Sequence, residues 1–95
     1  MHITITGSRH YMGMETYRIG DILLLKKDHD DHYDDEAIKV YSENGVIYGC
    51  VANSVDSVAR GTHSAGYIYN SIKEEARCKI LFVIDDSVIA ELLEE

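Results

Sequence analysis

Short stretches of alternating or uniformly apolar residues recur along this chain, and both patterns predict β-strands. Five stretches share these features: residues 2–6, 21–27, 37–42, 46–52 and 77–84. Asn44-Gly45 lies between the third and fourth stretch and is the strongest short signal for a hairpin. Gly49, inside the fourth stretch, predicts a bulge or a close approach of two backbones. Residues 88–93 fit either a last strand or a short helix.

The middle of the chain changes character and predicts two short helices. Asn53 or Ser54 can cap the first, over residues 55–59. Ser64 can cap the second, over about residues 65–73, which carries isoleucines four positions apart. Short strands joined by turns, with helices only in the second half, predict a mainly β fold: a small OB-like barrel.

Length and charge limit the possible functions. The 95 residues fit one domain, residues 1–95. The net charge is −8, with 17 acidic against 9 basic residues, and this opposes binding to a long phosphate backbone. Any nucleic-acid role is therefore expected at one strand end or pocket. The N-terminus lacks a signal-peptide pattern and no apolar run approaches the ~20 residues of a membrane helix, so we expect a cytoplasmic protein without membrane contact.

The sequence offers no constellation for catalysis. Cys50 and Cys78 lie in apolar runs without a zinc-binding pattern, and we expect buried free thiols. No phosphate-binding loop is present. Residues 62–66 resemble a nucleophile elbow, but the first glycine of that motif is replaced by Thr62. We therefore expect neither an enzyme nor a cofactor.

Residues 28–36 are the most charged part of the chain. They place six carboxylates and two histidines in nine positions, directly before a strand. Like charges repel, so an ordered loop here must be held in place, and such loops often carry function. His29, His32 and the aspartates are metal-ligand types, but the spacing of a calcium loop is absent, with no glycine at the sharp turn. No metal site is expected.

Two loops together offer groups that suit a nucleotide end. Arg9, His10 and Tyr11 follow the first strand, and Tyr33 and Asp34 precede the third, so the loops are expected to meet at one rim. An arginine can bind phosphate, tyrosine rings can stack on bases at ~1–3 kcal/mol per base, and an ionised carboxylate can accept from a hydroxyl. A purely structural alternative remains open: Tyr33 closes the barrel end and Asp34 forms an Asx turn.

Four segments, in their order and spacing, resemble a HIRAN domain: residues 7–11, 20–25, 33–40 and 48–51. The resemblance covers about residues 3–60, and its most specific part is the pattern Tyr-Asp-x-x-Ala-Ile-x-Val that begins at Tyr33. Two later blocks, residues 52–54 and 61–66, resemble the small stand-alone bacterial members.

The resemblance implies an OB-like barrel and a non-catalytic function. In Swi/Snf-type fork-remodelling ATPases, which act in DNA repair, this domain captures the 3′-hydroxyl end of single-stranded DNA. By motif position, residues 9–11 would grip the terminal nucleotides, Tyr33 would stack, and Asp34 would accept the hydrogen of the 3′-hydroxyl. Asp31 lies where the family has a polar, usually amide, residue.

This chain departs from the family pattern in charge. Cys50 and Asn53 lie where DNA-binding members carry basic residues, and the loop at residues 28–36 is unusually acidic. We therefore expect weak binding to a 3′ end of single-stranded DNA. The alternative function is an acidic protein-interaction module, or DNA mimic, that binds a basic nucleic-acid-processing partner.

Overall fold

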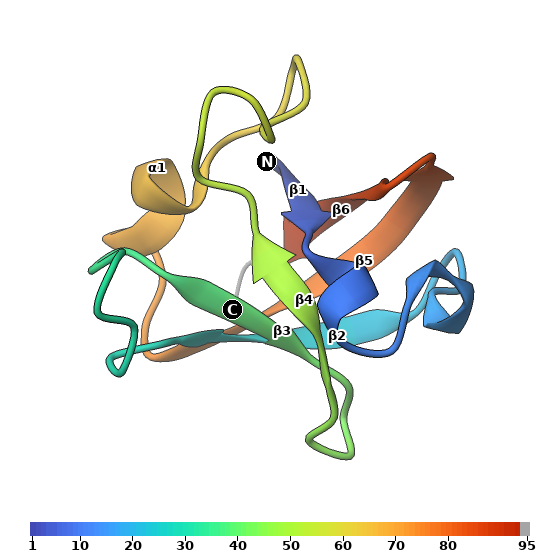
Figure 1. The fold of residues 1–95 in the computed structure, drawn as a ribbon, viewed down its shortest axis with the longest axis horizontal. Helices are drawn as coiled ribbons and strands as arrows, with labels where there is room; N and C mark the ends of the chain where they lie inside the picture. The colour runs from blue at the N-terminus through green and yellow to red at the C-terminus, as the bar shows by residue number, and fades with distance from the viewer. Residues whose placement is uncertain (94–95) are drawn as a thin grey trace.

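Six antiparallel strands form a closed barrel in the computed structural model, which describes residues 1–93 (Figure 1). The strands are His2–Thr6 (β1), Ile22–Lys27 (β2), Ile38–Tyr41 (β3), Ile47–Val51 (β4), Glu75–Ile84 (β5) and Ser87–Leu93 (β6). Their order around the barrel is β1-β4-β3-β2-β5-β6. This confirms the predicted mainly β, OB-like fold. The predicted turn at Asn44-Gly45 joins β3 to β4, and the ambiguous tail forms a strand.

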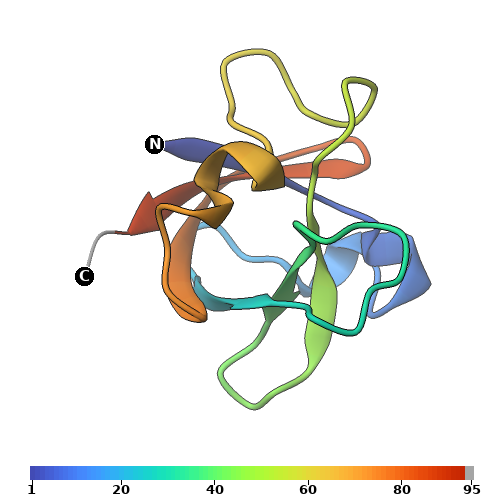
Figure 2. The same cartoon turned by 90° about the vertical axis from the view of Figure 1, so that its left-hand side faces the viewer.

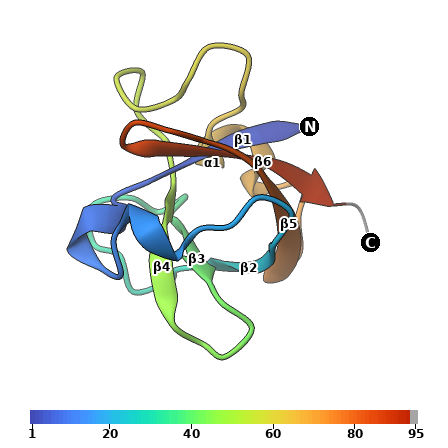
Figure 3. The ribbon, with the colours of Figure 1, turned by 90° about the vertical axis from the view of Figure 1, so that its right-hand side faces the viewer.

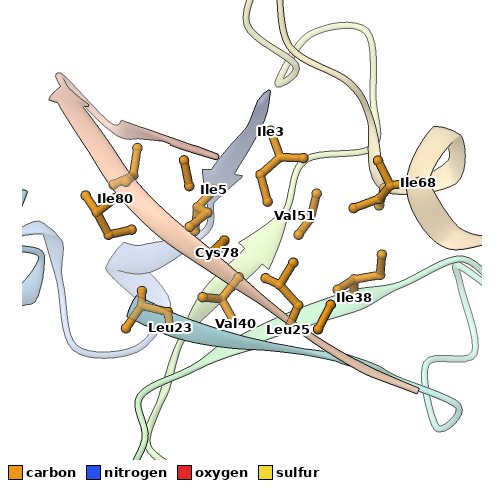
Figure 4. Packing of buried hydrophobic residues seen from close by; sticks show 14 of the residues in the cluster. Ile3, Ile5, Leu23, Leu25, Ile38, Val40, Val51, Ile68, Cys78 and Ile80 are labelled. Carbon is orange, nitrogen blue, oxygen red and sulfur yellow. The ribbon is translucent and has the colours of Figure 1, made fainter. Parts of the chain in front are cut away.

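Alternate residues of the strands point into the barrel and form the core (Figure 4). In β3, Ile38 and Val40 are buried, whereas Lys39 between them lies on the outer face. The largest fully buried aliphatic side chains are Ile3, Ile5, Leu25, Ile38, Val40, Ile68, Ile80 and Val88. Burial of one such side chain is worth ~1.5–3 kcal/mol, so this core is the main source of stability. Cys78 belongs to the core, Cys50 is half-buried, and both are free thiols as predicted.

The helix predicted over residues 55–59 is wrong, because this segment folds over β1 as a series of turns. The Thr4 hydroxyl on the outside of β1 accepts the N–H of Ala59 at 3.1 Å and lies 2.7 Å from the Thr62 hydroxyl. A helix would need that N–H for its own ladder. Val55 is 94% exposed and so does not pack against the barrel either.

One α-helix is present in residues 1–93, Ala65–Tyr69 (α1), shorter than the predicted 65–73. Ser64 caps it as predicted and accepts a backbone N–H at 3.2 Å. It ends in a tight turn in which Ser71 donates its N–H to the carbonyl of Ile68 at 2.9 Å. Figure 2 looks onto α1, which lies across this side of the barrel. No helix in the described chain is long and apolar enough to span a membrane.

Gly49 lies where β4 passes close to the end of β1. A Cβ atom at this position would lie 2.7 Å from the backbone oxygen of Thr6 and 3.1 Å from the Ser8 hydroxyl. The register between β3 and β4 also shifts, between Val40 and Tyr41. Both features predicted for Gly49, a close approach and a bulge in this strand pair, are therefore present.

We predict that Gly49→Ala destabilises the barrel by ~1–3 kcal/mol, because the backbone of β1 has to move to admit the methyl group. Urea denaturation followed by circular dichroism measures the change. Glu43→Ala, an exposed position in the adjoining hairpin, is the matched control and should change stability by less than ~0.5 kcal/mol. Equal stability of the two variants would show that β1 and β4 are not in close contact.

Candidate functional site

The acidic loop, residues 28–37 between β2 and β3, is held by hydrogen bonds to its own carboxylates. Asp31 Oδ1 accepts the backbone N–H of Tyr33 at 2.8 Å and of Asp34 at 3.0 Å. Asp34 Oδ1 in turn accepts the N–H of Glu36 at 2.9 Å. This last contact is the Asx turn of the structural alternative. The expectation that the loop is held in place is therefore confirmed, and aspartates provide the bonds.

Asp28 fixes the start of the acidic loop to the outer face of β3. Its Oδ2 lies 3.0 Å from Lys39 Nζ, and its Oδ1 accepts the N–H of Asp30 at 3.1 Å. The hydrogen bond from the Lys39 ammonium holds the pKa of Asp28 below its ordinary value, and the same carboxylate raises the pKa of Lys39. The only cation of β3 is thus already paired with a carboxylate.

Tyr11 approaches the same face from the other side. Lys39 and Cys50 are neighbours across β3 and β4, and the thiol of Cys50 lies beside the hydroxyl of Tyr11. Desolvation raises the pKa of Tyr11, with Cys50, Lys39 and Asp28 close enough to affect it. These four side chains lie close together at the outer face of β3 and β4. The acidic loop and the segment that follows β1 lie on either side of these two strands in Figure 1. Tyr11 and the start of the acidic loop, at Asp28, therefore approach one surface. The expected meeting of residues 9–11 with Tyr33 and Asp34 stays a prediction.

The segment that carries Tyr11 is a pair of 3-10 turns, Ser8–His10 (η1) and Met14–Thr16 (η2). Tyr17, which no sequence pattern marks, anchors this segment to the barrel. Its buried hydroxyl lies 2.6 Å from Ser8 Oγ and donates to the carbonyl oxygen of Tyr48 at 3.0 Å. Burial raises the pKa of Tyr17 to about 12, so the hydroxyl keeps its proton.

Arg9 points toward a different element. It forms an ion pair with Asp86 in the turn between β5 and β6. Figure 3 shows this turn. Both side chains are mostly exposed, 73% and 62%. Exposed pairs contribute only ~0–1 kcal/mol, so the guanidinium can exchange this partner for another anion at little cost. Arg9 contacts this turn, whereas Asp34 contacts Asn53 at the end of β4.

The remaining candidate side chains differ in exposure. Tyr33 is 100% exposed, so the alternative in which it closes the barrel end is wrong. His10 is also exposed, and Tyr11 is partly so. An exposed ring beside a fixed carboxylate, at Tyr33 and Asp34, is chemically suited to stacking on a planar group while accepting a hydrogen bond.

Asp34 is connected to the barrel and to α1 through Asn53. Its Oδ2 accepts from Asn53 Nδ2 at 3.0 Å, and Asn53 Oδ1 accepts the N–H of Gly66 at 2.7 Å. One carboxylate oxygen from each of residues 34–36 lies within 4.8 Å of the other two. Among the described residues, these three could together coordinate a cation. His29 does not belong to this group, and its Nε2 lies 2.6 Å from Glu74 Oε2.

Sequence reasoning missed three residues of this surface. Lys39 had a usable signal, because the alternation of β3 places it outward and the hairpin pairs it with Cys50. Asn53 appears in the sequence as a possible helix cap and as a departure from a family pattern, but its contact with Asp34 spans 19 positions and neither signal points to it. Tyr17 follows no periodic pattern, so nothing in the sequence marks it.

The model of the HIRAN domain matches residues 1–85. The chain belongs to the HIRAN family. The crystal structure of the HIRAN domain of human HLTF is similar, with a TM-score of 0.70 at 19% identity over 97% of this chain and 71% of that one. The crystal structure of a protein from Lactobacillus plantarum has a TM-score of 0.64 at 19% identity, over 96% and 87% of the two chains.

None of the curated proteins matches the chain significantly. At 19% identity, the two solved structures establish the fold of this HIRAN domain. They do not bear on its individual side chains. The predicted site residues, Arg9, His10, Tyr11, Asp31, Tyr33 and Asp34, therefore stay predictions.

The Asp28–Lys39 contact predicts a pH dependence of stability. Because the pKa of Asp28 is lower in the folded state than its ordinary value of 3.8, the stabilisation is present above that value and is lost as the pH falls below it. Asp28→Asn should be less stable than wild type at neutral pH and should lose less stability on acidification. Urea denaturation at neutral pH and near pH 3 measures both effects.

The matched control is Asp30→Asn, which removes a charge from an exposed position in the same loop. It should leave the acid-dependent loss intact. If Asp28→Asn and Asp30→Asn respond to pH in the same way, the ion pair with Lys39 does not contribute to folding.

Proposed function

We propose that this HIRAN domain binds the 3′-hydroxyl end of single-stranded DNA, weakly and without catalysis. HIRAN domains are nucleic-acid-binding modules, and membership of the family supports a nucleic-acid partner for this chain. The observation that carries the proposal is the pairing of a fully exposed ring, Tyr33, with the adjacent Asp34 carboxylate, which two hydrogen bonds orient.

Each group has a definite role in this proposal. Tyr33 stacks on the terminal base, and Asp34 accepts the hydrogen bond of the 3′-hydroxyl. Asp31 shapes the turn that presents both residues. Tyr11 contributes a second ring on the neighbouring face, and Arg9 binds a backbone phosphate after leaving Asp86.

The charge of the surface accounts for weak binding. Phosphate contacts from lysine and arginine supply most of the affinity of ordinary DNA-binding proteins. Here Lys39 is paired with Asp28 and Arg9 with Asp86, so the two cations nearest the proposed path are already neutralised. The terminal hydroxyl, which is uncharged, is the part of a DNA end that an acidic surface can still accept.

Fluorescence anisotropy at low salt, with oligonucleotides ending in a 3′-hydroxyl, a 3′-phosphate or a dideoxynucleotide, tests the proposal. We expect the 3′-hydroxyl end to bind best, because a phosphate is repelled by Asp34 and a dideoxy end has no hydrogen to donate. Asp34→Ala should abolish this preference. Arg9→Ala should weaken binding to all three ends alike, and Tyr33→Ala should weaken it at least about fivefold.

Asp30→Ala is the control, since it removes an exposed charge from the same loop without touching Asp34. It should keep the preference for the 3′-hydroxyl. Equal binding of wild type to the three ends, or binding to none of them, would overturn the proposal.

Removing the partner of Arg9 should strengthen DNA binding. Asp86→Asn frees the guanidinium for phosphate, and because an exposed ion pair is worth at most ~1 kcal/mol, the gain should reach up to about fivefold. Asp85→Asn is the matched control: it removes the same charge one position earlier, and asparagine tolerates the φ of +50° found there. Anisotropy titration compares the two. An equal gain in both would indicate general charge reduction instead of release of Arg9.

A second function is favoured by the exposure of the acidic loop. Asp30 and Asp35 are exposed on either side of Tyr33, which suits a basic protein partner. In this case the domain acts as an acidic interaction module or DNA mimic for a nucleic-acid-processing protein. The oligonucleotide experiment separates the two functions, because a DNA mimic has no reason to distinguish a hydroxyl from a dideoxy end.

A further inference from the structure

Asn53 lies where three separate parts of the fold meet. It follows the last residues of β4, its amide nitrogen donates to Asp34 in the acidic loop, and its amide oxygen accepts from Gly66 in α1. Its own backbone position is firmly set, because the preceding Ala52 donates its N–H to Thr4 at 2.8 Å and accepts the N–H of Ala65 at 2.9 Å. The side chain therefore starts from a fixed point of the barrel.

The orientation of the Asn53 amide follows from its partners. A backbone N–H can only donate, so the amide oxygen has to face Gly66, and the amide NH₂ then has to face Asp34. A flipped amide would put two donors together at Gly66 and two acceptors together at Asp34. The bond to α1 thus selects the one orientation in which Asn53 donates to the carboxylate.

Gly66 makes this arrangement possible. A Cβ atom on residue 66 would lie 3.1 Å from Asn53 Oδ1 and 2.7 Å from Glu36 Oε1. The absence of a side chain lets the amide and the acidic loop approach the first turn of the helix together.

We propose that Asn53 is a positioning residue for recognition of the 3′-hydroxyl, an inference that rests on the function proposed above. Each carboxylate oxygen offers about two acceptor positions. The N–H of Glu36 occupies one on Oδ1 and Asn53 occupies one on Oδ2, which prevents rotation of the carboxylate. The positions left over then point in fixed directions, and a hydroxyl donor meets a preorganised acceptor. Asn53 in this way sets the preference for one type of end without touching it.

The test is Asn53→Asp, a change that keeps the shape and the acceptor for Gly66 but removes the donor. At neutral pH two carboxylates then face each other and repel, so Asp34 leaves its position. We expect the preference for a 3′-hydroxyl over a dideoxy end to fall to about that of Asp34→Ala. Near pH 5 a close pair of carboxyls can share a proton, which restores a donor, and the preference should partly return; wild type should show no such recovery.

Two controls separate positioning from charge and from folding. Ser54→Asp adds the same charge at the next, exposed position and should keep the preference. Amide hydrogen exchange at Gly66 should stay protected in Asn53→Asp, which shows that α1 remains docked, and should increase in Asn53→Ala. If wild type prefers the 3′-hydroxyl and Asn53→Asp does so equally at neutral pH, the inference is overturned. If wild type shows no preference, the proposed function fails, and this inference fails with it.

Discussion

The candidate site depends on hydrogen bonds between aspartate carboxylates and backbone N–H groups in the acidic loop. Six carboxylates in nine residues would repel one another in an extended chain. In the folded loop, Asp31 accepts the N–H groups of Tyr33 and Asp34, and Asp34 accepts the N–H of Glu36, which sets two successive turns, one at each aspartate. The acidic composition is therefore what orders the loop. The turns leave Tyr33 in solvent and direct Asp34 toward the barrel.

Charge pairing occupies three of the nine basic residues of this acidic member of the HIRAN family. Arg9 is paired with Asp86, Lys39 with Asp28, and Lys26 lies 3.7 Å from Glu75. A surface whose cations are paired in this way attracts phosphates poorly and gains little affinity from contacts along a DNA strand. Recognition based on a ring and a hydrogen-bond acceptor needs far less positive charge. The proposed binding to one uncharged terminal group is consistent with both the family and the net charge of −8.

The strands were predictable because period-two alternation records which side of a strand faces the core, and that information is local. The hairpin at Asn44-Gly45, the close approach at Gly49 and the cap at Ser64 were likewise read from single positions whose backbone or side-chain chemistry is unusual. The helix over residues 55–59 failed for the opposite reason. This segment forms no helix because the Thr4 hydroxyl, 55 residues away in the sequence, accepts the N–H of Ala59.

The sequence by itself determined the mainly β barrel and the family, and it offered the Asx turn at Asp34 as an alternative, because each is signalled by short runs of neighbouring residues. Only the tertiary structure decided that Tyr33 stands in solvent instead of closing the barrel, that Arg9 pairs with Asp86 across 77 positions, and that Asn53 orients Asp34 across 19. Those contacts arise when closure of the barrel brings the ends of β1, β4 and β5 near the loops. The sequence pattern does not specify which of several similar carboxylates will contact Arg9 or Asn53.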